Sequence, residues 1–317
     1  MRDITYKSFS LRTARAVGFV SCPDDIIDRI RQNQLPKGNL LDIARASGLL
    51  ASKQTHHLIP HCHPVAIDSL NIDFQLKNSN SILEEFPDDL NAAGGVAIII
   101  EGKSIGRTGI EMEVLTAVSV TALTIYDLLK PLGQAELSIG PIRLMHKSGG
   151  KSDRALYTKS IKNAAVLVCS DSTATRKRED KSGRLIQEML LANNCHVTDY
   201  QIVPDDPDRI RDQILQWAEQ KIPFIFTTGG TGLGPRDNTV DTVRKIIEKD
   251  APGIAEAMRN HGGMRTPVAM MSRSVAGSIG ESLIITLPGS TNGVRESLDA
   301  ILPVVFHAKS MLRGNGH

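Results

Sequence analysis

The chain has 317 residues, of which 41% are hydrophobic and only 4% aromatic, and its 37 basic and 35 acidic residues leave a net charge of +2. A chain of this length typically forms about two domains, each large enough to bury a core. The balanced charge argues against a protein that binds duplex DNA, and the few aromatic residues argue against a stacking surface for single strands. We therefore expect no nucleic-acid partner.

Targeting signals and cysteine usage suggest a compartment. The first ten residues, MRDITYKSFS, lack the apolar core of a signal peptide. No uninterrupted apolar run reaches the roughly 18 residues of a membrane span. The four cysteines are widely spaced and form no CxxC pair, which is typical of reduced thiols: Cys22, Cys62, Cys169 and Cys195. We expect a cytoplasmic protein with no membrane partner.

The first half of the chain mixes helical and strand patterns. Residues 39–55 predict an amphipathic helix, and residues 70–76 alternate apolar and polar side chains as a half-buried strand does. Residues 95–100 predict a second strand and 142–147 a third, with a helix at 108–130 between them. The pattern predicts an α+β domain with helices on one face of an antiparallel sheet.

The second half alternates strands and helices. The polar segment 147–163 is the best linker candidate, and we expect domains at 1–153 and 163–317 joined by a linker at 154–162. Beyond it, strands are predicted at 164–170, 196–203, 223–228 and 282–288, and helices at 183–193, 207–220, 240–249 and 294–311. Such alternation predicts a doubly wound, mostly parallel α/β sheet, whose ligands bind beyond the carboxyl ends of the strands.

The helix expected at 108–130 carries charges only near its ends. No charged residue lies between Glu113 and Asp127, so the middle of the helix is suited to burial. Asp127 and Lys130 are three residues apart and therefore neighbours on the helix surface. A carboxylate beside an amine can tune the pKa of both groups and supply an acid/base pair. The alternative is a structural ion pair at the helix end.

The segment THHLIPHCHP at 55–64 concentrates imidazoles and a thiol: His56, His57, His61, Cys62 and His63. A metal site is one interpretation, but the spacing fits no common zinc pattern. If the segment were a strand, His61 and His63 would point to one side and Cys62 to the other. We favour hydrogen-bonding or phosphate-contacting histidines and predict no tightly bound metal in this half. Lys37 and Lys53 are further amines nearby, or ordinary surface lysines.

Three long strings of the first half resemble the cyclic pyranopterin monophosphate synthase family of molybdenum cofactor biosynthesis: residues 36–64, 106–130 and 139–152. The resemblance covers most of residues 1–153. It implies a ferredoxin-like fold, a hexamer built from dimers, and active sites at the dimer interface. It also implies that cyclic dihydro-GTP is rearranged to cyclic pyranopterin monophosphate with loss of pyrophosphate.

Residue roles in this half follow from the same resemblance. Catalytic roles are implied for Asp127 as acid/base, Lys130 as its partner, and Lys53. Substrate-binding roles are implied for Lys37, His61, Cys62, His63, Met112 and Glu113. Amines and imidazoles would offset the charge of a triphosphate, and a carboxylate beside an amine would move protons. Two positions depart from the family pattern: Asn39 replaces its usual Asp, and His61 its usual Leu.

A glycine-rich string follows a buried strand in the second half, at residues 224–241. Glycines permit positive φ and let backbone N–H groups approach an anion closely. The string is neither a P-loop nor a dinucleotide fingerprint. Asp237 and Asp241 follow the glycines and offer the oxygen ligands that Mg²⁺ prefers. The alternative is a tight turn in which Asp237 or Thr239 caps the next helix.

This string, together with residues 169–183, 266–277 and 287–290, resembles the molybdopterin adenylyltransferase family over residues 163–314. The resemblance implies a trimer that binds molybdopterin and ATP with Mg²⁺ and transfers AMP to the pterin's phosphate. The implied pterin- and nucleotide-binding residues are Gly229, Gly230, Thr231, Gly232, Asp180, Asp237, Asp241 and Ser290, with Asp237 as a Mg²⁺ ligand. The family string PRDVTPE reads PRDNTVD here.

The combined interpretation is a bifunctional enzyme acting at two steps of one pathway, on cyclic dihydro-GTP, molybdopterin and ATP. We expect a homo-oligomer, either a hexamer or a trimer, since the two arrangements share a threefold axis. One alternative keeps the first half catalytic and makes the second a pterin-binding scaffold. Another, of a different class, is a non-catalytic sensor of molybdate or nucleotide.

Overall fold

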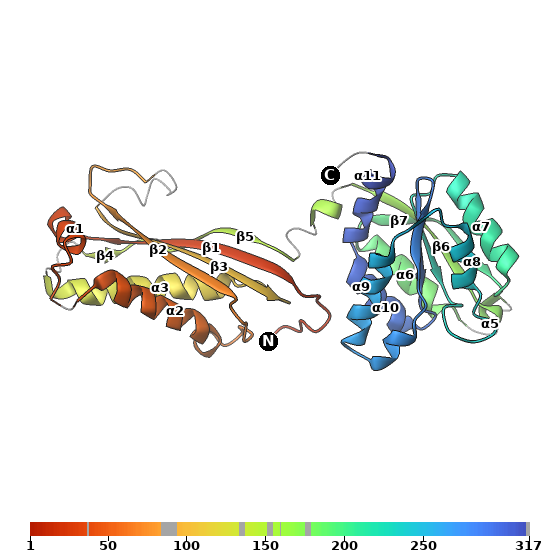
Figure 1. Ribbon diagram of the computed structural model, residues 1–317, viewed down its shortest axis with the longest axis horizontal. Coiled ribbons are helices and arrows are strands. Elements are labelled where there is room, and N and C mark those ends of the chain that lie inside the picture. Colours follow the sequence, from red (N-terminus) through yellow and green to blue (C-terminus); the bar gives the residue numbers. More distant parts are fainter. Residues whose placement is uncertain are drawn as a thin grey trace. The chain divides into compact units, whose positions relative to one another are not determined.

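The structure is a computed structural model that describes residues 1–317 except 37, 84–93, 133–136, 151–154, 159, 175–178 and 315–317, and it leaves the side chains of 155, 156 and 172 undescribed. The chain divides into two compact units, Met1–Ser152 and Asp153–His317. Each unit has its own sheet and its own hydrophobic core (Figure 1).

The first unit is an antiparallel sheet with its long helices on one face (Figure 1), as predicted. Its strands run in the order β2-β3-β1-β4, with β5 also paired to β1. They are β1 Ser10–Ser21, β2 Ser69–Lys77, β3 Gly95–Gly106, β4 Ser138–Ile139 and β5 Arg143–Ser148. The helices are α1 Asp24–Arg31, α2 Leu40–Leu58 and α3 Glu111–Leu129, followed by the 3₁₀ turn η2 Lys130–Leu132.

The main core of this unit lies between the sheet and its helices. Side chains at alternate positions of β1 and β3 pack there against α3, α2 and α1. Gly18 of β1 lies under α3, where an added Cβ would come within 2.5 Å of Val118. At the start of α2, Asn39 accepts hydrogen bonds from the amides of Leu41 (3.1 Å) and Asp42 (3.3 Å). Asn39 therefore caps the helix as an aspartate would.

By length and mean hydropathy alone, Glu111–Leu132 could cross a membrane, which the count of consecutive apolar residues did not anticipate. In the structure, α3 contributes residues such as Val114, Ala117 and Ile125 to the main core of the first unit. A core helix that packs against a sheet passes the same composition test, and 44% of the apolar window of α3 is buried inside the structure.

The second unit has a six-stranded sheet in the order β7-β6-β8-β11-β10-β9. The four strands β7, β6, β8 and β11 are parallel, and β10 and β9 are antiparallel additions at one edge. The strands are β6 Lys162–Cys169, β7 Cys195–Val203, β8 Phe224–Thr228, β9 Lys249–Asp250, β10 Ala276–Ile279 and β11 Ser282–Leu287. The predicted mostly parallel α/β sheet is confirmed.

Helices cover both faces of this sheet (Figure 1). Ala164, Val166 and Val168 of β6 face a core with α6, α9 and α10, whereas the alternate residues of the strand face a second core with α7 and α8. These helices are α6 Lys181–Leu191, α7 Pro207–Glu219, α8 Thr239–Ile246, α9 Pro252–Gly263 and α10 Thr291–Ile301, and the short helices are α5 Asp171–Ala174 and α11 Ala308–Leu312. Burial on both faces explains the continuous apolar sequence of β6.

Two segments differ from the sequence prediction. The final helix expected at 294–311 is broken into α10, the 3₁₀ turn η5 Val304–His307 and α11, because Pro303 lacks the N–H that would continue α10. Within the segment expected to be a linker, the 3₁₀ turn η3 Ala155–Thr158 belongs to the second unit. The ring of Tyr157 meets that of His307 edge-on at 5.8 Å.

Candidate functional site

In the first unit, Asp127 and Lys130 lie together at the carboxyl end of α3. The Lys130 Nζ is 3.1 Å from an Asp127 carboxylate oxygen. Their side chains are 59% and 49% exposed, so the pair faces solvent in the single chain. An exposed pair of this spacing contributes little to stability. A purely structural ion pair would therefore add little to the stability of this helix end.

The other predicted residues of this half lie at the opposite end of the helical layer. Glu113 occupies the first turn of α3 and is buried, and burial, together with the charge of Glu111, raises its pKa. Cys62 follows the end of α2; burial and the nearby Glu113 charge raise its pKa. The carboxyl end of α2 and the amino end of α3 meet at this end of the layer (Figure 1). This end also carries Lys53, His61, His63 and Met112.

The histidine-rich segment is not the strand considered from the sequence: His56 and His57 lie in the last turn of α2, and His61, Cys62 and His63 lie in the loop that follows. The alternation of side-chain direction that a strand would impose therefore does not apply to His61, Cys62 and His63. Within the described residues, no three His, Cys, Asp or Glu side chains gather closely enough to hold a metal ion. Lys37, the expected phosphate-binding lysine, lies outside the described residues.

The single chain thus divides the predicted residues into two groups. Glu113 and Asp127 are 14 positions apart on one continuous helix, which at 1.5 Å per residue separates them by about 21 Å along the axis. No side-chain rotation closes such a gap. One end of α3 therefore carries Glu113, beside Lys53, His61, Cys62, His63 and Met112, and we call these residues the Glu113 group. The other end carries the Asp127–Lys130 pair.

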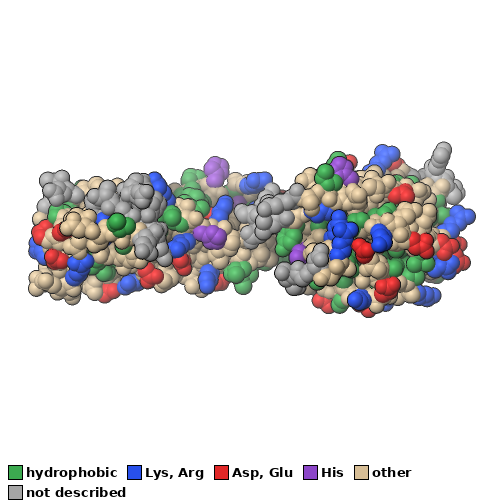
Figure 2. All heavy atoms as spheres, turned by 90° about the horizontal axis from the view of Figure 1, so that it is seen from above, with side chains coloured by type: hydrophobic (Ala, Val, Ile, Leu, Met, Phe, Trp, Pro, Cys, Tyr) green, Lys and Arg blue, Asp and Glu red, His purple; other side chains and the backbone are tan. Residues whose placement is uncertain are grey.

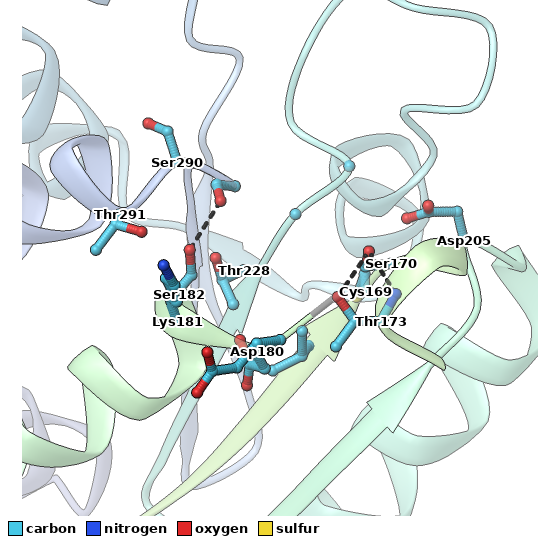
Figure 3. A pocket seen from close by; sticks show the side chains of 15 residues that line it. Cys169, Ser170, Thr173, Asp180, Lys181, Ser182, Asp205, Thr228, Ser290 and Thr291 are labelled. Atoms are coloured by element: carbon cyan, nitrogen blue, oxygen red, sulfur yellow. Dashed lines mark hydrogen bonds between the residues drawn. The ribbon is translucent and has the colours of Figure 1, made fainter. Parts of the chain in front are cut away.

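In the second unit, a cavity of about 340 Å³ lies beyond the carboxyl ends of β6, β8 and β11 (Figure 3). We call it the polar cavity, because hydroxyl and carboxylate side chains line most of it. It is lined by Val168, Cys169, Ser170, Thr173, Glu179, Asp180, Lys181, Ser182, Asp205, Thr228, Gly229, Gly230, Gly289, Ser290 and Thr291. Figure 3 shows Ser290 and Thr291 at one end of this lining and Asp205 at the other.

The glycine turn leaves no room for side chains. Gly229 and Gly230 have φ of +96° and +62°, in the left-handed region. An added Cβ would lie 2.1 Å from the Cys169 carbonyl oxygen at Gly229 and 2.3 Å from Thr239 Oγ1 at Gly230. Glycine is therefore required at both positions by close packing against the rest of the unit. Both residues also line the polar cavity, and backbone amides at such glycines can approach an anion closely.

Several predicted residues of this half also stabilise local structure. Asp180 caps α6 through the Gly183 amide (2.8 Å) and accepts a hydrogen bond from Tyr200 Oη. Ser290 caps α10 through the Gly293 amide at 3.2 Å. Asp237 accepts from the Gly234 amide at 2.7 Å and closes the loop, and the cap position of α8 falls to Asn238.

The remaining predicted residues lie away from the polar cavity. Asp241 is in the first turn of α8 and forms an ion pair with Arg273. Thr231 and Gly232 continue the glycine turn toward a second cavity. The predicted pterin- and nucleotide-binding residues are therefore divided between the polar cavity and its surroundings.

Sequence reasoning missed Asp205, which lines both the polar cavity and a neighbouring cavity of similar volume that Asp237 also lines. Its amide donates to Asp171 (3.0 Å), and its Oδ2 accepts from the Asp171 amide (3.2 Å). Its Oδ1 is buried and has no hydrogen-bond partner in the described part of the chain. Burial raises its pKa, and the charges of Asp171 and Asp237 add to the shift. Only its position two residues beyond β7 could have indicated it.

Comparison with known proteins assigns a family to each unit. Residues 1–150 match the model of the MoaC family, and residues 165–307 match that of the probable molybdopterin binding domain. The chain is therefore a two-domain protein of molybdenum cofactor biosynthesis.

Relatives of full length identify the particular arrangement. The chain is 40% identical to the molybdenum cofactor biosynthesis bifunctional protein of Chlorobaculum tepidum, over all of this chain and 96% of that one. It is 35% identical to the Synechococcus elongatus protein of the same name, over all of this chain and 98% of that one. The chain belongs to this family of bifunctional molybdenum cofactor biosynthesis proteins.

Proteins that match one half are also known. The cyclic pyranopterin monophosphate synthase of Desulfitobacterium hafniense is 39% identical over 51% of this chain and 91% of its own. The crystal structure of the molybdopterin biosynthesis enzyme MoaB from Thermus thermophilus is 41% identical over 49% of this chain and 98% of its own, with a TM-score of 0.47.

Proposed function

We propose that the first unit is a cyclic pyranopterin monophosphate synthase, which rearranges cyclic dihydro-GTP and expels pyrophosphate. The observation that carries the proposal is the solvent-facing Asp127–Lys130 pair at 3.1 Å, in a domain homologous to such synthases. The carboxylate would accept and return protons, and the ammonium would offset negative charge that develops beside it. Lys53 and His63 would offset the charge of the phosphates, with Lys37 in the same role.

A complete site of this kind requires a second copy of the chain. The Glu113 group and the Asp127–Lys130 pair are about 21 Å apart on one helix. Two copies of α3 placed antiparallel would bring the first group of one copy to the pair of the other. The run without charged side chains between Glu113 and Asp127 suits such a contact. We therefore propose a homo-oligomer whose smallest active form is a dimer.

The synthase assignment is tested with cyclic dihydro-GTP and the purified chain. Pyrophosphate release by the parent, lost in Asp127→Asn and in Lys130→Ala, is the expected result. Arg45→Ala on α2 is the control, since the contacts of Arg45 with Asp42, the Ile72 carbonyl and the Phe74 ring involve none of the predicted site residues. Release that survives Asp127→Asn would overturn the assignment.

We propose that the second unit binds molybdopterin and transfers AMP to it from ATP. The observation that carries this proposal is the bare glycine turn with positive φ at the edge of the polar cavity. An oxygen of the pterin's terminal phosphate would attack the α-phosphorus of ATP, and pyrophosphate would leave. The amides of Gly229–Gly232 and the hydroxyl of Ser290 would hold phosphate oxygens.

The residues present fit the Mg²⁺ that ATP carries. Asp205 keeps one buried oxygen without a hydrogen-bond partner in the described part of the chain, and Asp237 lines the adjoining cavity. Mg²⁺ in nucleotide sites commonly takes one or two carboxylates and completes its shell with phosphate oxygens and water. The bound ion would supply charge neutralisation at the phosphates. Asp180 would contribute indirectly, by capping α6, and Asp241 would contribute by holding Arg273 in an ion pair.

Adenylyl transfer is separated from simple binding by one assay. The chain is incubated with molybdopterin and MgATP, and adenylated pterin and pyrophosphate are measured. Product made by the parent and lost in Asp237→Ala is expected. Pterin binding without product from the parent would favour the alternative in which the second unit is a scaffold, an alternative that the structural roles of Asp180 and Ser290 keep open.

Two wider features belong to the same proposal. The order β2-β3-β1-β4 with two helical crossovers on one face supports a ferredoxin-like fold for the first unit. A cytoplasmic location is supported by the substrates proposed, which are nucleotides and an intermediate derived from GTP.

A further inference from the structure

The amino end of α6 contributes one part of the lining of the polar cavity. Asp180, Lys181 and Ser182 at this helix end all line that cavity (Figure 3). The Ser182 Oγ also donates to the Gly289 carbonyl at 2.8 Å, which ties α6 to the loop before α10. A shift of this helix end would therefore change the cavity at α6 and at that loop together.

Both oxygens of the Asp180 carboxylate are held by donors of the protein. The Gly183 amide donates to Oδ1 at 2.8 Å, and the hydroxyl of Tyr200 on β7 donates to Oδ2. Asp180 lines the polar cavity and also a neighbouring one, whereas Tyr200 lines only the neighbouring one of these two. A ligand in the polar cavity would therefore meet Asp180 and not Tyr200.

A glycine provides the space that this contact needs. Gly183 lies in the first turn of α6 and is buried. A Cβ added there would overlap the Tyr200 hydroxyl and the Asp180 carboxylate, and would lie 2.7 Å from a methyl group of Val168. Glycine is among the least favourable residues within a helix. The close approach of the phenol to α6 explains why it stands at this position.

The charge of Asp180 has opposite effects on the helix and on a phosphate ligand. A carboxylate stabilises the amino end of a helix, but it repels phosphate oxygens in a cavity that it lines. Because both oxygens accept hydrogen bonds, the carboxylate is held in one orientation and part of its charge is offset. Without the Tyr200 hydroxyl, Oδ2 would lose its partner and could turn toward the polar cavity.

We propose that Tyr200 is a positioning residue of the polar cavity, whose hydroxyl holds the Asp180 carboxylate at the amino end of α6 and away from the phosphates of bound MgATP. This inference rests on the proposed function of the second unit, which assigns nucleotide phosphates to that cavity. Tyr200 itself contacts no ligand, and Asp180 transmits its effect. A tyrosine that merely packs β7 against α6 would have no such dependence on Asp180.

The test is a double-mutant cycle on the affinity of the full chain for MgATP, measured by isothermal titration. Tyr200→Phe keeps the ring and removes only the hydroxyl. Asp180→Ser removes the carboxylate and keeps a side-chain oxygen that can cap α6. The matched control is Tyr157→Phe, which makes the same change before β6, at the end of that strand remote from the polar cavity.

Tyr200→Phe should weaken MgATP binding by about 10-fold, the lower end of what a hydrogen bond to a charged group contributes. In the Asp180→Ser background, the same change should alter the affinity by less than about twofold. Tyr157→Phe should match the parent. In turnover, Tyr200→Phe should raise KM for MgATP and leave kcat within about twofold, because binding and not chemistry is weakened.

Gly183→Ala provides an independent variant, since its methyl group would displace the same contact. It should weaken MgATP binding as Tyr200→Phe does, with melting curves that show a folded chain. Equal losses from Tyr200→Phe in the parent and in Asp180→Ser would show that the hydroxyl acts through packing alone and would overturn the positioning role.

Measuring adenylated molybdopterin in parallel separates this inference from the proposed function. A parent that makes the product, with Tyr200→Phe binding MgATP equally well, would overturn the positioning role and leave the function standing. A parent that binds MgATP, shows the coupling and makes no product would support the positioning role and overturn adenylyl transfer. A parent that binds no MgATP would overturn both.

Discussion

Two inactive variants of the first unit should restore each other's activity if its sites are shared between copies. Asp127→Asn removes the proposed acid/base at the carboxyl end of α3, and Lys53→Ala removes an amine of α2 near the opposite end of the helical layer. Both side chains are exposed, so neither change should disturb folding. Each variant alone should lose about 10²–10⁴-fold of its rate, as is usual when acid–base groups are removed.

The size of the recovery follows from the two-group geometry. When the variants associate at random in equal amounts, about half of the dimers are mixed. In a mixed dimer, one site receives both substitutions and the other receives neither. About a quarter of all sites are therefore intact, and the mixture should regain about a quarter of the parental rate per chain.

The assay is pyrophosphate release from cyclic dihydro-GTP by co-expressed chains that carry different affinity tags. Tandem purification selects mixed oligomers, in which about half of the sites should be active if the oligomer is a dimer and about a quarter to a half if it is larger. Tandem-purified mixed oligomers that stay as inactive as the single variants would refute the shared site. Full activity in either variant alone would show that its substituted residue is not needed.

Three further predictions concern single groups of the first unit. Asn39→Ala should lower the free energy of unfolding by about 1 kcal/mol by removing the cap of α2, whereas Asn39→Asp should leave it nearly unchanged in urea titrations. Burial raises the pKa of Glu113, so the folded state binds the proton more tightly and this unit should lose stability as pH rises through that pKa. Glu113→Gln should therefore raise the melting temperature at pH 7 and lose that advantage below about pH 4. An equal gain at both pH values would refute this account. In the native chain only Cys62 should react with a thiol reagent at pH 8, because burial raises the pKa of the other thiols to about 12; Cys62→Ser should abolish the reaction, and more than one reactive thiol would contradict it. The protected thiols are Cys22, Cys169 and Cys195.

Strong local patterns predicted most of the fold. The unbroken apolar run of β6 indicated burial on both faces, and its alternate residues do face two cores. The central strand β1 was not predicted, because it packs small residues such as Ala14, Ala16 and Gly18 under α3 in place of β-branched ones. The sequence of a strand predicts it poorly when its burial depends on the elements that pack against it.

The candidate sites were predicted less evenly. The glycine turn was found because positive φ restricts the residue type, and Gly229 and Gly230 have that φ. Asp205 was missed because an aspartate after a strand has many ordinary uses, and its exchange of hydrogen bonds with Asp171 joins positions 34 residues apart. The division of the first unit's residues into two groups follows from the unbroken length of α3, which residue roles alone do not convey.

The short edge strand β9 has a consequence for the solubility of the second unit. It pairs with β10 over two residues only, and both, Lys249 and Asp250, are charged and exposed (Figure 2 shows the charged side chains of the surface by type). An exposed strand with free backbone groups is a template for pairing with other chains, and brevity and charge are two means of blunting it. This edge is therefore protected against strand-by-strand aggregation.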